Sequence, residues 1–217
     1  MHEHEFEPVP GLPERLPPGE RLLWQGSPEW RGIARRVFHL DLLAVYFAGL
    51  VAWAGLDAAR AGGIDALVPA VIVPLTLSLG ALAMLAMLAH LTARSAVYSI
   101  TSRRVVLRIG VVLSVTFNIP FRRIASADLK RFRDGSGDLA LTLGRDDHIG
   151  YLHLWPHARP WRWGRPQPAL RSLSDVEGVA SILSRAMMAA DPSVAISAEP
   201  RDARGLDAAS ASLAGAR

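Results

Sequence analysis

The chain has 217 residues, no cysteine and a formal net charge of +4, and half of its residues are hydrophobic. Without cysteine, this sequence holds no disulfide framework, thiolate nucleophile or cysteine-ligated metal. The mean hydropathy of +0.21 is high for a soluble domain and low for a chain made only of membrane helices, so we expect a small membrane anchor joined to a polar domain.

Residues 1–30 are rich in proline, glycine and glutamate and predict irregular chain, and we expect residues 1–36 to form a cytoplasmic N-terminal segment. Residues 20–30 add apolar side chains beside a turn, and either a short strand or a membrane-surface segment fits them. Trp24 and Trp30 fit interfacial anchors or ordinary packing residues equally well. The acidic start lacks a signal-peptide pattern, so we expect insertion to use internal spans.

Two apolar runs predict a transmembrane helical hairpin over residues 37–91. The run 66–89 holds 24 residues without charge; as a helix it is about 36 Å long, more than the roughly 30 Å of a bilayer core. We place the spans at about 37–56 and 66–90. A buried helix of a soluble protein is the weaker alternative, because such helices rarely lack a polar face.

Two prolines lie inside the second predicted span, Pro69 and Pro74. The carbonyl groups that they free can be satisfied in a membrane by Ser, Thr or a neighbouring helix. A three-span arrangement, with the run split at Pro74, fails because each half is too short to cross a bilayer.

Positive charge flanks the hairpin on one side. Arg31, Arg35 and Arg36 precede the first span and Arg94 follows the second, whereas the link 57–65 holds one arginine. Because arginine-rich flanks stay cytoplasmic, we expect a multi-pass protein of the bacterial inner (intracytoplasmic) membrane with both termini in the cytoplasm.

From Ser95 the pattern changes to short β-branched segments separated by turn signals such as AspGlySerGly at 134–137. Six or seven strands predict a small antiparallel barrel or sandwich over residues 95–190, including a strand at 148–155 and an irregular loop at 156–168. One amphipathic helix follows, with an apolar stripe of Val176, Val179, Leu183, Ala186 and Met187.

Ser174 and Glu177 have the spacing of a capping box at the start of this helix. Residues 191–217 hold few large apolar side chains and predict a disordered tail. The fold class is therefore α+β: a two-helix transmembrane hairpin plus a small antiparallel β-barrel closed by a C-terminal helix.

Residues 92–133 carry nine basic side chains and one acidic side chain. Such a cluster beside a membrane attracts anionic headgroups; a solvated face that only sets topology is the alternative, and nucleic acid ranks lowest because no reader motif is present. The residues that we select for docking to lipid or partner are Arg103, Arg104, Arg122 and Arg123.

A second docking candidate is the loop at 155–168, which alternates tryptophan with arginine. Tryptophan and arginine dominate interface hot spots, although packing over one end of a barrel is the alternative. The residues selected here are Trp155, Trp161, Arg162 and Trp163.

The histidines give only weak candidates for a cofactor. His148, His153 and His157 do not converge on one strand face, so we predict no metal site. His39 and His90 lie at the cytoplasmic ends of the two predicted spans; a headgroup contact is the favoured role for them and a bacteriochlorophyll ligand the alternative, so we assign no cofactor. No nucleophile–base pattern, phosphate loop or catalytic carboxylate pair is present, so we expect no enzyme.

Four fragments, in this order, resemble the bacterial pleckstrin-homology (PH) family. GluArgLeuLeuTrpGlnGlySerPro (20–28) is similar to the stretch that often precedes a membrane hairpin in such proteins. TyrSerIleThrSerArgArg (98–104) resembles the opening strand pair, AsnIleProPheArgArgIle (118–124) the Ile-Pro segment, and GlySerGlyAspLeu (135–139) a later glycine step.

A narrower resemblance covers nearly the whole chain. Residues 6–30, 35–39 and 154–163 are similar to photosynthetic-complex assembly proteins of purple bacteria, the PuhB family. This resemblance implies a non-enzymatic membrane assembly factor that contacts reaction-centre and light-harvesting subunits, and it brings no catalytic residues. The alternative is a membrane-anchored PH-like module that binds anionic lipid headgroups; a homo-oligomer is left open.

Overall fold

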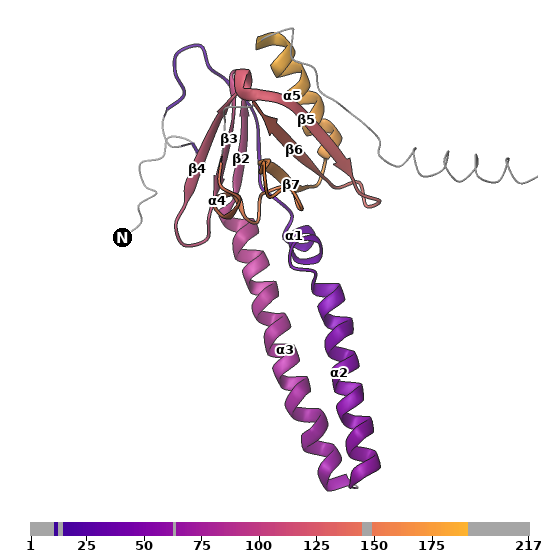
Figure 1. Cartoon of the computed structure of the whole chain (residues 1–217). Helices are drawn as coiled ribbons and strands as arrows, with labels where there is room; N and C mark the ends of the chain where they lie inside the picture. Colours follow the sequence, from indigo (N-terminus) through magenta and orange to yellow (C-terminus); the bar gives the residue numbers. More distant parts are fainter. Residues whose placement is uncertain (1–10, 13–14, 63, 145–148, 191–217) are drawn as a thin grey trace, which may run out of the picture. The chain divides into compact units, whose positions relative to one another are not determined.

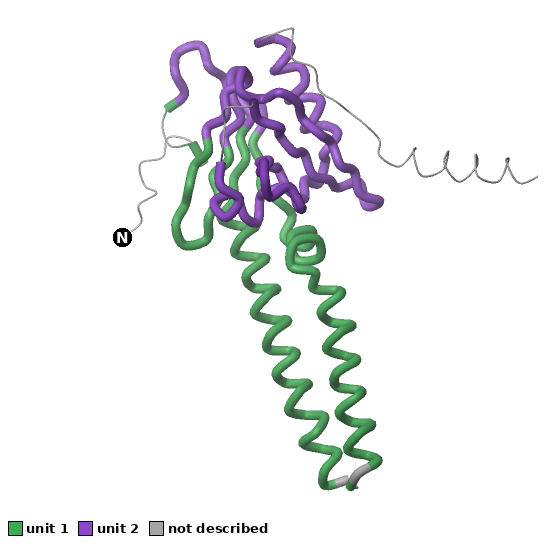
Figure 2. Tube along the Cα trace, in the orientation of Figure 1, with its two compact units in different colours: residues 1–15, 25–99, 107–117 green, residues 16–24, 100–106, 118–217 purple. Residues whose placement is uncertain are grey.

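The computed structural model describes residues 11–12, 15–62, 64–144 and 149–190. The chain divides into two compact units (Figure 2): unit 1 is residues 1–15, 25–99 and 107–117, and unit 2 is residues 16–24, 100–106 and 118–217. The predicted disordered tail, 191–217, lies outside the described residues.

Unit 1 contains the two long helices that the apolar runs predict (Figure 1). A short helix α1 (Trp30–Arg36) leads into α2 (Leu40–Ala61), and α3 (Ile64–Ser95) follows. Both long helices are long and apolar enough to cross a membrane, and only 6% of the most apolar window of each is buried within the chain. That exposure disfavours a core helix of a soluble protein, in which the apolar side chains would be covered.

The two long helices pack against each other, and α1 packs on α3. Gly55 of α2 lies where the helices approach closely, because a Cβ atom there would be 3.0 Å from a methyl group of Val71. On α1, Ile33 and Ala34 are buried against Ala89 and Ala93 of α3. Small residues thus set the spacing of this helical unit.

Helix α3 is continuous through Pro69 and Pro74, so the structure has two long helices and not three. Thr76 donates a hydrogen bond to the carbonyls of Ile72 and Val73, and Ser78 donates one to the carbonyl of Pro74 at 2.6 Å. The hydroxyls therefore satisfy backbone carbonyls of residues 72–74 inside this helix. The carbonyls that lose an N–H donor to a proline are those four residues before it.

Within the described residues, seven strands form two antiparallel sheets. The four-stranded sheet has the order β1 (Leu22–Gly26), β2 (Val97–Thr101), β3 (Arg104–Ile109) and β4 (Val115–Pro120). The three-stranded sheet has the order β5 (Ile124–Arg131), β6 (Gly137–Leu143) and β7 (Ala169–Leu173). The boundary between the two units crosses strands β1 to β4.

The predicted closed barrel is not what the described residues form, because the hydrogen-bonded strands make two separate sheets. Between β4 and β5 the chain passes through a 3₁₀ turn, Phe121–Arg123, directly after Pro120. Pro120 has no N–H to donate to a ladder. The chain therefore leaves one sheet before it enters the next.

Two local predictions need correction, and one alternative that was left open is decided. The described part of the predicted strand at 148–155, residues 149–155, is not a strand: the short helix α4 (Tyr151–Leu154) lies there, and the missed strand is β7. Strand β1 comes from before the helical hairpin, which favours the strand reading of residues 20–30. Ser174 does not cap α5 (Val176–Ala190); Asp175 accepts the hydrogen bond from the Gly178 N–H at 2.9 Å.

The apolar stripe predicted for the last helix is confirmed, since all five of its residues are buried. Helix α5 packs on β5 and β6, where Leu139 and Leu141 lie opposite Leu129 and Ala127 in register. Gly137 permits this approach, because a Cβ atom there would be 2.5 Å from a Val176 methyl group.

Candidate docking site

The predicted docking residues lie in unit 2 on two separate segments of the chain. Trp155, Trp161, Arg162 and Trp163 belong to the loop between α4 and β7, which we name the tryptophan loop (residues 155–168). Arg103 and Arg104 lie at the β2–β3 turn, and Arg122 and Arg123 lie in the 3₁₀ turn before β5.

The two ends of the tryptophan loop are paired through the backbone. Ala158 and Pro168 form an antiparallel bridge, the Arg159 N–H donates to the Gln167 carbonyl at 2.9 Å, and the Ala169 N–H donates to the His157 carbonyl at 2.8 Å. The pairing closes the loop into a narrow hairpin-like base. Residues 160–166 are thereby confined to its tip.

Charged side chains fix this base to the three-stranded sheet. Arg159 forms an ion pair with Asp128 of β5 and donates to the Gln167 side-chain oxygen at 2.9 Å. Gln167 in turn donates to the Thr142 hydroxyl of β6 at 2.9 Å. The Arg159–Asp128 and Gln167–Thr142 contacts each join the loop to a sheet strand, so they tie the base of the loop to the three-stranded sheet.

A second ion pair lies beneath the loop. The Arg171 side chain lies 3.0 Å from an Asp138 carboxylate oxygen and donates to the Ala158 carbonyl at 3.0 Å; both charged side chains are at least nine-tenths buried. Asp138 also accepts a hydrogen bond from the Ser172 N–H at 2.8 Å. Buried charges that are paired and hydrogen-bonded in this way hold a loop in one geometry.

The tip of the loop projects its aromatic side chains outward. Trp161 is 86% exposed and Trp163 is 65% exposed, and Trp155 is about half exposed. The Trp163 ring lies 4.5 Å from the Tyr151 ring, centroid to centroid, while Arg162 is exposed between the two tryptophans. Packing over a barrel end, the alternative for this loop, does not fit these exposures.

His157 is buried in the base of the loop. Burial, together with the positive charge of Arg171, lowers the pKa of His157 to about 3. The imidazole is therefore neutral at neutral pH. His153 is exposed, His148 lies outside the described residues, and within the part that the structure describes no group of three metal-ligating side chains occurs.

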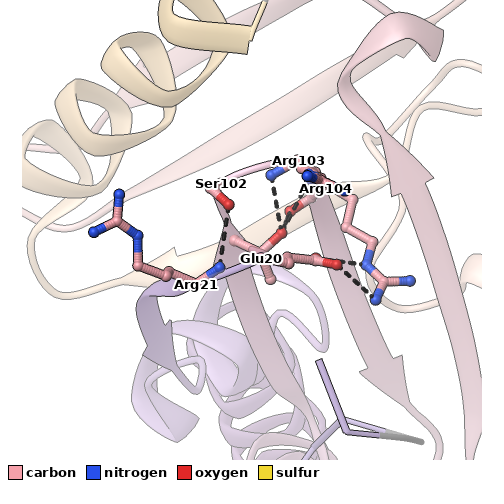
Figure 3. A network of polar contacts seen from close by, with 6 residues as sticks. Glu20, Arg21, Ser102, Arg103 and Arg104 are labelled. Atoms are coloured by element: carbon pink, nitrogen blue, oxygen red, sulfur yellow. Dashed lines mark hydrogen bonds and ion pairs between the residues drawn. The ribbon is translucent and has the colours of Figure 1, made fainter. Parts of the chain in front are cut away.

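The β2–β3 turn is organised by Thr101 and Glu20 (Figure 3). The Thr101 hydroxyl accepts hydrogen bonds from the N–H groups of Arg103 and Arg104 at 3.2 and 3.0 Å. The Glu20 carboxylate accepts two hydrogen bonds from Arg104, at 2.7 and 3.0 Å. The Arg21 N–H donates a hydrogen bond to the Ser102 hydroxyl at 3.1 Å, and the Ser102 N–H donates one to the Arg21 carbonyl at 2.9 Å.

The Glu20 carboxylate is nearly buried. Burial by itself raises the pKa of Glu20, but hydrogen bonds from Arg104 and Thr101 and the charges of Arg104 and Arg103 outweigh it, so the pKa lies below its ordinary value of 4.5. Glu20 is ionised at neutral pH and compensates the charge of Arg104. A docking role for Arg104 therefore receives no support from this arrangement.

The other arginines of the predicted set are exposed. Arg103, Arg122 and Arg123 are exposed residues. The Phe121 N–H donates a hydrogen bond to the Arg103 carbonyl at 3.1 Å, which joins the two turns. Phe121 itself is buried. The structure thus brings Arg103 next to the 3₁₀ turn that carries Arg122 and Arg123.

The two histidines named as weak pigment candidates lie in unit 1. His39 is exposed with a left-handed backbone just before α2. His90 is exposed on α3, with its ring edge-on to Trp30 at 6.2 Å. His90 therefore has an aromatic contact within the chain. The same Trp30 ring lies under the Arg31 guanidinium, whose carbon is 5.7 Å from the ring centroid.

Comparison with known proteins agrees with this arrangement of two long apolar helices and antiparallel sheets. Residues 39–187 match the family described as the bacterial PH domain. The chain belongs to the bacterial PH domain family. The match includes both long helices as well as the strands from β2 onward, so the helical hairpin is part of what this bacterial PH domain protein shares with its family.

One similar protein is 42% identical over 190 residues, which is 87% of this chain and 89% of that relative. It is described as an uncharacterized 23.7 kDa protein in the puhA 5′ region of Rhodobacter capsulatus. No solved structure matches this chain.

Proposed function

We propose that this protein is a non-enzymatic membrane assembly factor that helps photosynthetic reaction-centre and light-harvesting subunits to associate. The observation that carries the proposal is the tip of the tryptophan loop, where Trp161 and Trp163 are exposed on a base fixed by ion pairs. Rigid, exposed tryptophans next to arginine have the composition of an interface hot spot. Little conformational entropy is lost when such a loop binds.

The photosynthetic context comes from two sources. The relative in Rhodobacter capsulatus is named for its position in the puhA 5′ region, and residues 6–30, 35–39 and 154–163 resemble the PuhB family. The last of these segments includes the tip of the tryptophan loop. The similarity and the exposed surface therefore point to the same part of the chain.

In this proposal α2 and α3 cross the bacterial inner (intracytoplasmic) membrane and both termini lie in the cytoplasm. Arg35 and Arg36 are the basic residues at the end of α1, just before α2, and Arg94 is the basic residue in the last turn of α3. The positive-inside rule places these ends in the cytoplasm. Centrifugation of a lysate tests insertion, and protease protection of Arg94 and the following residues tests the orientation.

The outer faces of the helices offer a second contact with partner subunits. A Cβ atom at Gly49 or Gly80 would meet nothing within 4 Å, so these small residues are not used in packing α2 against α3. Glycine on an open helix face permits another transmembrane helix to approach closely. Another copy of the chain is the competing occupant of this face.

The deciding experiment uses a photosynthetic host in which the gene that encodes this protein is deleted and replaced by genes for variants of the chain. We expect the double variant Trp161→Ala, Trp163→Ala to accumulate normally but to lower the yield of assembled reaction centre, read from membrane absorption spectra, without changing pigment synthesis. The control is Arg133→Ala, an exposed residue on another turn. Normal complex yield in the double variant, with normal pull-down of the subunits, would refute the proposal.

The alternative function is binding of anionic lipid headgroups, and the observation that favours it is the exposed group Arg103, Arg122 and Arg123. The isolated segment 95–190 is unsuitable for testing it, because that segment lacks β1 and Glu20. Native mass spectrometry of the full chain in detergent is suitable. Retention of anionic lipid that falls in the triple alanine variant and at high salt would favour lipid binding.

A further inference from the structure

The turn between β3 and β4 is the most exposed apolar segment of the four-stranded sheet. Val112 is 92% exposed and Leu113 is 81% exposed, and Val111 and Val115 flank them with about two-fifths of their surface open. From residue 109 to residue 121 the sequence holds no charged side chain. We name residues 110–115 the apolar turn.

The backbone of the apolar turn has a tightly constrained conformation. Gly110 has a φ of +122°, and a Cβ atom there would lie 2.0 Å from the Leu113 carbonyl oxygen, so only glycine permits this tight chain reversal. The reversal directs Val112 and Leu113 outward. Because β4 is an edge strand, an uncovered apolar tip here is an aggregation liability, and such patches normally have an occupant.

The apolar turn belongs to unit 1, the unit that holds α2 and α3 (Figure 2). Within this unit the turn reaches the level of α1 and of the C-terminal end of α3. That end of the hairpin carries Trp30 beside His90 and Arg31, with Arg35 and Arg94 also exposed. Tryptophan together with arginine marks the headgroup level of a membrane-spanning helix.

We propose that the apolar turn inserts Val112 and Leu113 into the boundary between headgroups and acyl chains of the membrane that α2 and α3 span. A lipid occupant fits better than a protein because the tip is apolar, carries no charge to set a partner's register, and lies at the headgroup level of its own unit. The turn is then a third membrane contact that limits rotation of the sheet about the hairpin.

This inference rests on the proposed membrane insertion of α2 and α3 and is independent of the assembly role. The experiment is site-directed spin labelling of the full chain in nanodiscs, at one chain per disc. Because the sequence has no cysteine, Val112→Cys and Leu113→Cys each create one labelling site. Val45→Cys, on the exposed face of α2, is the membrane reference, and Arg133→Cys is the water reference.

We expect labels at Val112 and Leu113 to collide with oxygen several-fold more often, relative to a water-soluble nickel chelate, than the label at Arg133. Nickel accessibility equal to that of Arg133 would overturn the inference. Protection from both oxygen and nickel would also overturn it, since a protein would then cover the turn. If the Val45 label is water-accessible, the proposed membrane insertion fails as well, so the two failures are distinguishable.

Discussion

Glu20 and Arg104 join two segments that are 84 positions apart in the chain. The Glu20 carboxylate lies just before β1 and accepts two hydrogen bonds from the Arg104 guanidinium at the start of β3. Each residue belongs to one of the fragments that resemble the bacterial PH family. Those fragments are therefore related by a direct contact, across a sequence interval that contains the whole helical hairpin.

We expect this pair to stabilise the protein measurably. In a double-mutant cycle with Glu20→Ala and Arg104→Ala, the coupling free energy should be about 1–3 kcal/mol, because the bonds are charge-assisted and the carboxylate is shielded from water. Denaturant unfolding of the full chain in detergent, followed by tryptophan fluorescence, measures it. The matched control is the ion pair of Arg131 and Glu177, in which a guanidinium nitrogen lies 2.7 Å from a carboxylate oxygen and both side chains are well exposed. This pair should couple by about 0–1 kcal/mol.

The buried pair beneath the tryptophan loop should be more sensitive. Arg171→Met should lower the free energy of unfolding by about 3–5 kcal/mol, because Asp138 would keep a buried charge without its partner. Adding Asp138→Asn should recover part of that loss, since the remaining buried group is then neutral. Equal stability of Arg171→Met and the unchanged protein would show that the pair does not hold the base of the loop.

The pH dependence of stability should reflect His157. Its folded pKa of about 3 lies below the unfolded value, so the unfolded chain binds the proton more readily, and stability is lost as pH falls below about 6.5. From pH 7 to pH 5 the loss should be about 2 kcal/mol. The pKa of Glu20 lies below its ordinary value of 4.5, so the stability that ionised Glu20 contributes is lost only when the pH falls below about 4.5.

Unfolding of the full chain in detergent at several pH values measures this loss. His157→Gln should flatten the profile between pH 7 and pH 5, because glutamine does not titrate in this range. A profile with the same slope in the variant would assign the pH dependence to another group.

Two glycines of α2 should behave differently. Gly55→Leu should separate α2 from α3 and lower the thermal stability of the hairpin in detergent, because its Cβ atom already meets Val71 at 3.0 Å. Gly49→Leu should leave the hairpin intact, since nothing lies within 4 Å, yet lower the amount of partner subunits recovered by pull-down. Similar melting of both variants would contradict the helix contact described for Gly55.

The strongly patterned parts of the chain were predictable from sequence. The uncharged run at 66–89 requires a long apolar helix, and the stripe from Val176 to Met187 gives the buried face of α5. Periodicity reports local structure and burial, and both hold here. Strands β2 to β6 were also recognisable, because β-branched residues alternate between turn signals.

Tertiary contacts decided the rest. The sequence 148–155 alternates like a strand, but residues 151–154 of it form the short helix α4, whereas AlaLeuArgSerLeu at 169–173 carries a central arginine and is nevertheless a buried strand. Arg171 is tolerated there because Asp138, 33 positions earlier, supplies the opposite charge. No window of sequence around residue 171 contains that information.

The sequence by itself determined the apolar hairpin, the mixed α and β composition, the loop that alternates tryptophan with arginine and the clustered arginines. Only the tertiary structure decided that Arg104 is neutralised by Glu20, that β1 joins the sheet from before the hairpin, and that the strands form two sheets rather than a closed barrel. Hydrophobic periodicity is a local property of neighbouring residues, whereas ion pairing and sheet order depend on which distant segments meet.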